Sequence, residues 1–194
     1  MNGVTARLAG PLTALVLCAA SLSAQQSAGR VDASLEAGIR GSRLRGATEA
    51  LWGGAGLIQA HPRVAVGGAG WLLVGRSEIV GTTPGSDLEL SFGYAGAMAD
   101  LLLFDSPAGR LSLRMLVGAG NAKVLVPVVG SEIGADNFGI VEPEVVAARW
   151  LAGMLSVRAS LSYRFAYGVD DLPQVITSDL RGISFAVSVG IGRP

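Results

Sequence analysis

Hydrophobic and polar residues alternate with a period of two along much of the chain. In residues 155–167, LSVRASLSYRFAY, apolar side chains occupy the odd positions and Ser, Arg or Ala occupies the even ones. Residues 31–39, 110–120 and 183–192 follow the same pattern. Because successive side chains of a β-strand point to opposite faces, this period is typical of strands. Each segment is therefore predicted to be a strand with one apolar face and one polar or small face.

Four less regular segments bring the number of predicted strands to eight. They are residues 48–59, 64–75, 88–104 and 140–150. The connections alternate in length, with short turns at 60–63, 105–110 and about 152–153, and longer segments at 41–46, 75–87, 124–139 and 168–181. Short turns on the periplasmic side and longer loops outside are typical of barrels that cross a bilayer. The sequence thus predicts an all-β fold, an eight-stranded antiparallel up-and-down transmembrane β-barrel.

The width of such a barrel indicates which face of each strand meets lipid. Its interior has just enough room for side chains, so the bulky odd-numbered residues of 155–167 would overfill it, whereas the small even-numbered ones would fit. A water-facing exterior would carry residues such as Lys and Glu, yet the polar face of 183–192 consists of Ser, Ala and Gly. We therefore expect apolar side chains outside, against lipid. The structural alternative is a soluble periplasmic barrel or sandwich with its apolar face inside.

Charged side chains on the inward face must be paired, because an isolated ion in a narrow bore is costly. The inward phase of the predicted strands contains both signs of charge. The candidates are Glu36, Glu89, Glu142 or Glu144, Arg114, Arg158 and Arg164. We expect these residues to form structural ion pairs inside the barrel.

One strand predicts a specific pair. Its lipid-facing phase runs on even numbers from Leu88 to Met98, which would place Asp100 in lipid. A β-bulge near Ala99 would instead turn Asp100 inward, and the tight turn that follows would set it opposite Arg114. We predict a cross-strand ion pair between Asp100 and Arg114; the alternative is that Asp100 lies at the membrane rim.

Pro143 interrupts the strand predicted at 140–150. Proline cannot donate a ladder hydrogen bond, and a closed barrel offers no free edge at which that loss is harmless. We therefore expect Pro143 near the outer end of its strand, above the lipid.

The N-terminus has the layout of a cleaved secretory signal. Arg7 precedes the uncharged stretch LAGPLTALVLCAASLSA, which ends in small residues, as a signal peptide does before its cleavage site. We predict cleavage after Ala24, so that residues 1–24 are removed and residues 25–194 form a single domain; the alternatives are cleavage after Ser23 and a lipoprotein signal at Cys18. Cys18 is the only cysteine of the chain, so the mature protein cannot contain a disulfide.

Charge and hydropathy narrow the class of protein further. Fifteen basic and fifteen acidic side chains cancel, which argues against a nucleic-acid partner. Half of the residues are hydrophobic and the mean hydropathy is +0.48. No apolar run after the predicted signal approaches the roughly 20 residues that a membrane helix needs.

The signal, the eight alternating strands and the alternating connections together resemble the small outer-membrane β-barrels, such as the OmpA transmembrane domain and OmpX- or OmpW-like proteins. The resemblance covers the mature chain and lies in architecture alone. It implies a location in the outer membrane, contact with its lipid and lipopolysaccharide, delivery by periplasmic chaperones and the barrel-assembly machinery, and a monomer. The chain departs from the family at its end, GIGRP, where such proteins typically finish on an aromatic residue.

The predicted function is a non-enzymatic structural or surface-interaction role, with loops outside and a plugged polar lumen, since open channels need about 16 strands. The alternative is a narrow carrier or passage for a small ligand, hydrophobic or polar, whose entrance residues 124–130 could shape; these residues could equally extend the preceding strand. The last outer loop is acidic and could bind a cation together with lipopolysaccharide or a partner. Its acidic residues are Asp170, Asp171 and Asp179.

The inventory of catalytic groups is poor. The mature chain has no cysteine, and its only histidine, His61, lies in a predicted tight turn beside Pro62. No spacing matches a nucleophile with its base, a phosphate-binding loop or a set of metal ligands. We predict no enzymatic activity, no catalytic residues, no cofactor and no metal site.

Overall fold

The structure is a computed structural model, and it describes residues 32–75, 77–79, 88–126, 131–169, 172 and 175–192. The predicted signal at residues 1–24 lies outside these ranges. Within them, no helix is both long enough and apolar enough to cross a membrane.

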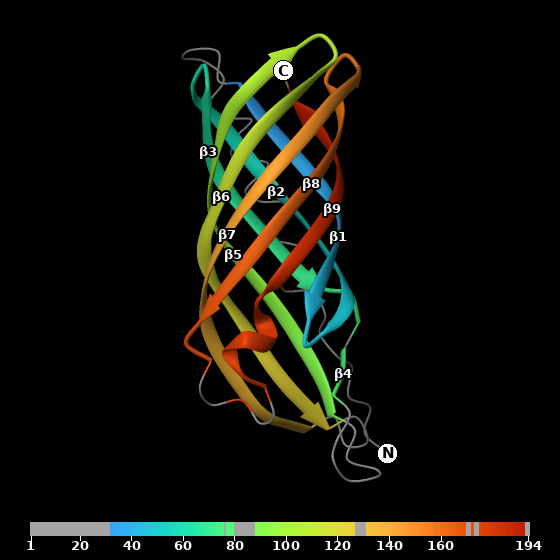
Figure 1. The fold of residues 1–194 in the computed structure, drawn as a ribbon, viewed down its shortest axis with the longest axis vertical. Helices are drawn as coiled ribbons and strands as arrows, with labels where there is room; N and C mark the ends of the chain where they lie inside the picture. Colours follow the sequence, from blue (N-terminus) through green and yellow to red (C-terminus); the bar gives the residue numbers. More distant parts are fainter. Residues whose placement is uncertain are drawn as a thin grey trace, which may run out of the picture. The chain divides into compact units, whose positions relative to one another are not determined.

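The described residues form nine strands and one short 3-10 helix, η2 (Figure 1). Their bounds are β1 Ala33–Leu44, β2 Ala47–His61, β3 Val64–Leu73, β4 Ser77–Ile79, β5 Leu88–Ser106, β6 Gly109–Val126, β7 Ser131–Ala152, β8 Leu155–Tyr167, η2 Thr177–Leu180 and β9 Gly182–Gly192. Pairing runs β3-β2-β1-β9-β8-β7-β6-β5, and β3 also pairs with β5, so eight strands close into a ring. The short β4 pairs with the first residues of β5, Leu88 to Leu90. The predicted eight-stranded antiparallel barrel is confirmed.

The register fixes the dimensions of this ring. Starting from Ala166 on β8 and following each paired residue around the barrel, the path passes through Glu36 on β1 and returns to β8 at Ser156, ten residues away. For eight strands, a stagger of this size requires the strands to tilt by about 40° and leaves a bore only wide enough for side chains.

The faces of β8 are arranged as the alternation predicts. Tyr163 and Phe165 are 43% and 38% exposed, whereas Arg158 and Arg164 are 7% and 0% exposed. β9 repeats the pattern along its length. Bulky apolar groups therefore cover the exterior of this half of the barrel, and small or charged groups face the bore.

β5 reverses the predicted phase. Its even-numbered residues, among them Leu90, Phe92 and Tyr94, are buried in the bore and do not face outward. The expected bulge near Ala99 is absent; the register shift of β5 lies between Leu102 and Phe104. The prediction was wrong because it assumed that bulky residues must face lipid, whereas one part of the bore is itself apolar.

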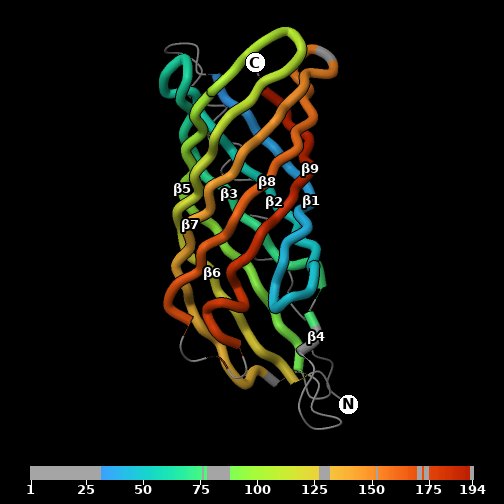
Figure 2. Tube along the Cα trace, in the orientation of Figure 1, coloured from blue at the N-terminus to red at the C-terminus, as the bar shows by residue number. Residues whose placement is uncertain are grey.

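The connections follow the predicted rule at one end of the barrel and break it at the other. Two-residue turns at 62–63, 107–108 and 153–154 gather at one end, here called the turn end (Figure 2). At the opposite loop end, β1 and β2 are joined by Arg45 and Gly46 alone, both with positive φ (50° and 83°), as a tight hairpin turn requires. The expected loop at 124–139 is mostly strand, because β6 continues to Val126 and β7 begins at Ser131.

Pro143 lies in the middle of β7, and the expectation that it sits near the outer end was wrong. It pairs normally with Met115 on β6. On the other side, the β7–β8 pairing skips from Val141 to Glu144. The missing N–H therefore faces β8, where the Tyr163 carbonyl lacks its ladder donor. The wall tolerates proline here because the loss is confined to one bond on one side.

The outward apolar face predicts the response to a charge. Val187 is an exposed residue in the middle of β9, beside Ile39 and Ala159. We expect Val187→Arg to destabilise the barrel in lipid vesicles by about 2–4 kcal/mol, because an arginine at mid-depth on the lipid face is costly. Val187→Leu is the control and should change little. Urea unfolding in vesicles measures both; a neutral effect of arginine would instead indicate a water-facing surface.

Candidate functional site in the bore

The interior of the barrel carries three groups of side chains in order along its axis. Nearest the turn end is the inner network, formed by Glu36, Asp100, Arg114 and Arg158. Next is the central network, formed by Arg40, Tyr94, Glu142, Glu144 and Ser162. The loop end is filled by an apolar cluster, here called the plug, which includes Leu44, Leu51, Leu90, Phe92, Phe138 and Leu180.

The inner network contains the predicted Asp100–Arg114 pair. Arg114 donates from Nε to Asp100 Oδ2 at 2.7 Å and from Nη1 to Glu36 Oε1 at 2.6 Å. Arg158 donates from Nη1 to the second oxygen of Glu36. Asp100 thus lies within the bore and not at the rim. Two carboxylates and two guanidiniums balance, which offsets the cost of taking these charges out of water.

The central network is built around Arg40, which the sequence analysis missed. Arg40 donates to Glu142, to Glu144 Oε1 at 2.8 Å and to the Tyr94 hydroxyl at 3.0 Å. Its guanidinium also lies 4.0 Å from the centre of the Trp71 ring, a favourable cation–π contact.

Glu142 is the most heavily used acceptor of the central network. The Tyr94 hydroxyl donates to its Oε2 at 2.8 Å, and the Ser162 hydroxyl donates to its Oε1 at 2.5 Å. The sequence left open whether Glu142 or Glu144 faces inward; both do. Arg40 was missed because its strand was ended at Ile39, although it continues the even phase that contains Glu36.

Arg164 connects the wall of the barrel to the loop end. It is fully buried and donates from Nε to the Leu180 carbonyl at 2.7 Å and from Nη1 to the Ser42 hydroxyl at 3.0 Å. Its guanidinium lies 4.9 Å from the centre of the Phe92 ring. The described residues supply it with no ion pair. Its charge instead balances the central network, which holds two carboxylates and one guanidinium.

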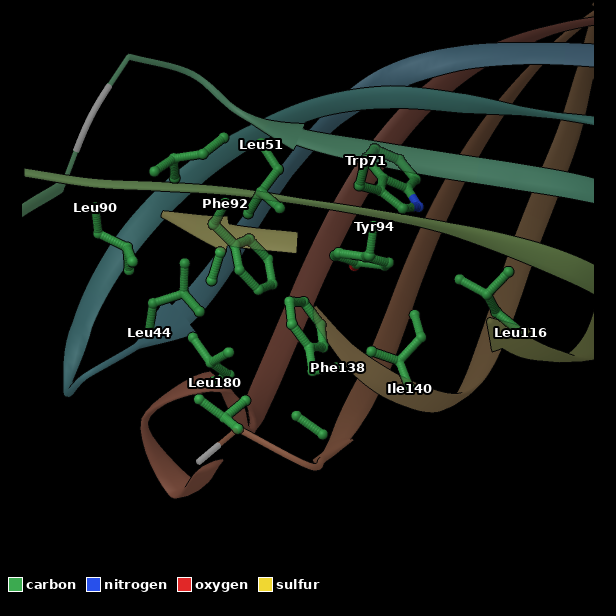
Figure 3. Close-up of a cluster of buried hydrophobic side chains, with 14 of the residues drawn as sticks. Leu44, Leu51, Trp71, Leu90, Phe92, Tyr94, Leu116, Phe138, Ile140 and Leu180 are labelled. Atoms are coloured by element: carbon green, nitrogen blue, oxygen red, sulfur yellow. The ribbon is translucent and has the colours of Figure 1, made fainter. Parts of the chain in front are cut away.

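The plug makes the loop end of the bore apolar, which the prediction of a polar lumen did not anticipate. The rings of Phe92 and Phe138 stack with centroids 5.3 Å apart. Figure 3 shows Leu180, from η2, pointing into the cluster from the loop that joins β8 to β9. Val169 and Val175 of the same loop are also buried. The loop therefore closes the bore by packing.

Other residues singled out from the sequence lie outside the bore or outside the described ranges. Glu89 is on the face of β5 opposite Leu88 and Leu90, so it is not a lumen residue, and the reversed phase of β5 explains the error. Asp179 Oδ2 accepts from the Ile176 N–H at 3.1 Å and so closes the turn of its own helix. Asp170 and Asp171 are not among the described residues.

The chemistry available to these groups is that of charge pairing. His61 is exposed at the turn end, where its Nδ1 accepts a long hydrogen bond of 3.4 Å from the Arg63 N–H. Over the described ranges, no group of three or more His, Cys, Asp or Glu residues is placed to hold a metal ion.

Comparison with solved structures places this fold among small outer-membrane barrels. Neisserial surface protein A (NspA) superposes with a TM-score of 0.63 at 11% identity, over 84% of this chain and 97% of that one. Ail of Yersinia pestis gives 0.56 at 13% identity, over 85% and 100%. The N-terminal barrel domain of Pseudomonas aeruginosa OprF gives 0.51 at 13% identity, over 84% and 100%. The expected likeness in architecture is confirmed.

No protein-family model and no curated protein sequence matches the chain. At identities of 11–13%, the superpositions show a shared fold and transfer no residue roles.

The burial of the inner network predicts that removing one of its carboxylates lowers the unfolding free energy more than removing an exposed carboxylate does. We expect Glu36→Gln to cost about 3–5 kcal/mol of unfolding free energy, because it leaves Arg114 and Arg158 buried with too little compensating charge. Asp105→Asn breaks the more exposed pair with Arg110 and should cost about 0–1 kcal/mol. Urea unfolding of both variants in the same detergent measures the difference; equal costs would mean that water solvates the inner network.

Proposed function

We propose that the chain is an outer-membrane β-barrel with a structural or surface-interaction role and no enzymatic activity, formed after removal of residues 1–24. The observation that carries this proposal is the combination of an apolar exterior with a filled bore. The inner network, the central network and the plug together occupy the described interior. Such a barrel anchors the segments at its loop end and does not serve as a general pore.

The spacing of polar residues on the exterior supports a place in a bilayer. Along the outward face of β7, the exposed Asn137 lies toward the loop end and the exposed Arg149 toward the turn end, with apolar residues such as Val145 between them. Twelve residues of a strand tilted by about 40° span about 30 Å along the barrel axis. That height fits the apolar band of an outer-membrane barrel together with its margins.

The length of the strands at the loop end supports a surface role. Pairing of β7 with β8 ends at Gly139, so residues 131–138 of β7 continue beyond it while paired with β6. β4 and the first residues of β5 extend the same sheet. Lys123 and Glu132 form an exposed ion pair on it, 2.8 Å apart. This four-stranded extension presents an ordered polar surface beyond the predicted lipid boundary, where binding segments of such scaffolds usually lie.

Two of the structural neighbours bear names that fit such a role. Ail is named an attachment invasion locus protein, and its structure was determined with the heparin analogue sucrose octasulfate. NspA is named a surface protein. We propose for this chain a surface-exposed loop end of the same general kind, a surrounding of outer-membrane lipid and lipopolysaccharide, delivery by periplasmic chaperones and the barrel-assembly machinery, and a monomeric state.

A carrier of hydrophobic ligands has less support. Its ligand would need room inside the barrel, but the cavity at the turn end measures about 50 Å³ and is bounded by residues of the inner network, including Asp100, Arg114 and Arg158. In the described part of the bore, the plug fills the apolar end by side-chain packing.

Fractionation tests the proposed location. The full chain, expressed with its N-terminus in a Gram-negative host, is expected in the outer-membrane fraction, lacking residues 1–24 by mass spectrometry and migrating differently on a gel before and after boiling. Closed barrels show this heat dependence because their ladder has no edge from which to unravel. Recovery in the soluble periplasm, with one migration position, would contradict the proposal.

Conductance tests the filled bore. In planar bilayers we expect the purified barrel to give no steps above the bare membrane. The double variant Phe92→Ala and Phe138→Ala removes two stacked rings from the plug. The central network should then remain as the barrier to ion flow through the bore. Frequent large steps from the unaltered protein would contradict the role as an anchor and favour a passage.

A further inference from the structure

The turn end of the bore contains a small cavity that the proposed function does not use. Its volume is about 50 Å³, which is room for a few water molecules or one small ion. It opens between the ends of seven strands and is lined by Arg63, Arg110, Ala148, Trp150 and Arg158, among others. Arg114 and Asp100 of the inner network form part of its lining.

The strand register places two arginines on either side of a small residue at this cavity. Arg110 on β6 pairs with Ala148 on β7, and Ala148 pairs with Arg158 on β8. The two arginines are thus two strands apart, at a backbone separation of about 10 Å, and the Ala148 methyl leaves the space between them open. Trp150 is the next inward-facing residue of β7 toward the turn end.

Several buried hydrogen-bond donors at this cavity lack an acceptor. Trp150 Nε1 and Arg110 Nε are buried and form no hydrogen bond in the described structure. The Arg158 side chain is more than nine-tenths buried, and among the described residues its Nη1 donates to Glu36 while its other nitrogens donate to nothing. Burying a donor without an acceptor is unfavourable, and more so when the donor is charged. Two such donors around one space, Trp150 Nε1 and Arg110 Nε, indicate a missing acceptor.

Two carboxylates, Asp32 and Asp100, and four arginines line the cavity. The Asp32 carboxylate is exposed and forms no hydrogen bond or ion pair among the described residues, whereas the other nearby carboxylates are engaged. Asp100 accepts from Arg114, and both oxygens of Glu36 accept from Arg114 and Arg158. Asp105 accepts from Arg110 through Nη2, which leaves Arg110 Nε unbonded. The surrounding chain thus supplies donors in excess, and the complementary group is one that carries only acceptors.

We propose that this cavity is an oxyanion-binding site that takes a carboxylate or phosphate group. Arg110 would hold its oxygens from the β6 side, Arg158, whose guanidinium lies beside Gly190 on β9, from the other side, and Trp150 would donate a third hydrogen bond. Planar guanidiniums are well suited to carboxylate and phosphate oxygens. In the proposed orientation the site opens to the periplasm, so its ligand is a small oxyanion or the anionic group of a larger periplasmic molecule. The site itself does not depend on that orientation.

Tryptophan fluorescence of the purified full chain in detergent tests the proposal. Sodium phosphate and sodium acetate are titrated separately against sodium chloride at constant ionic strength. Trp150 is one of three tryptophans; Trp52 faces outward and Trp71 lies against Arg40, so Trp150→Phe identifies the signal of the cavity. We expect a saturable change with at least one of the two oxyanions, absent with chloride and absent in Trp150→Phe.

Three further variants separate binding from general charge effects. Arg110→Gln removes one guanidinium and should weaken binding about 10-fold or more, in line with the loss of a charge-assisted hydrogen bond. Ala148→Leu fills the space without removing a charge and should abolish saturation. Arg149→Gln is the matched control, since Arg149 is exposed on the outer face of the same strand, and it should bind like the unaltered protein.

The outcomes are distinct. Saturation by phosphate alone, acetate alone or both, lost in Arg110→Gln and Ala148→Leu but kept in Arg149→Gln, supports the site and identifies the preferred class of anion. A response that chloride reproduces, or one that all variants share, would overturn it and leave a water-filled cavity. An unchanged heat-dependent gel migration of each variant shows that loss of binding is not loss of the barrel.

Discussion

The structure depends on one constraint: a ring of eight strands encloses a bore about one side chain wide, and that bore must be both filled and electrically neutral. The closed ladder satisfies the backbone, so the inward-facing side chains must fill the bore and balance its charge. Near the turn end, ion pairs such as those of Arg114 with Glu36 and Asp100 fill the bore and keep it neutral. Near the loop end, packed aromatic rings and leucines fill the bore (Figure 3).

Much of this could be predicted from residue order, because a closed barrel translates alternation directly into inside and outside. The reasoning worked on β8 and β9, whose two phases differ in size and polarity. It failed on β5, whose inward residues Phe92 and Tyr94 are bulky while its outward residues Ala95 and Ala97 are small and exposed. Alternation identifies two faces, but it does not say which is inside when the bore changes character along its length.

In the candidate site, too, some contacts could be predicted from the sequence and others could not. Paired charges such as Asp100 and Arg114 could be predicted from strand phase and turn length. Arg40 could not, once its strand was ended too early, and it is the centre of the larger network. The unbonded donors of Trp150 and Arg110 depend on the register of three strands. Such a juxtaposition follows from pairing between distant segments, which no local pattern records.

Pro143 has a consequence for how the wall can fail. Every other stretch of the β7–β8 contact up to Trp150 is continuous, so the interrupted positions opposite Tyr163 form the least cohesive line along which these two strands meet. Under mechanical load, β7 and β8 would begin to separate at these positions, while β8 stays paired with β9 and β9 with β1. A single imino acid thus sets the point at which the β7–β8 contact is weakest.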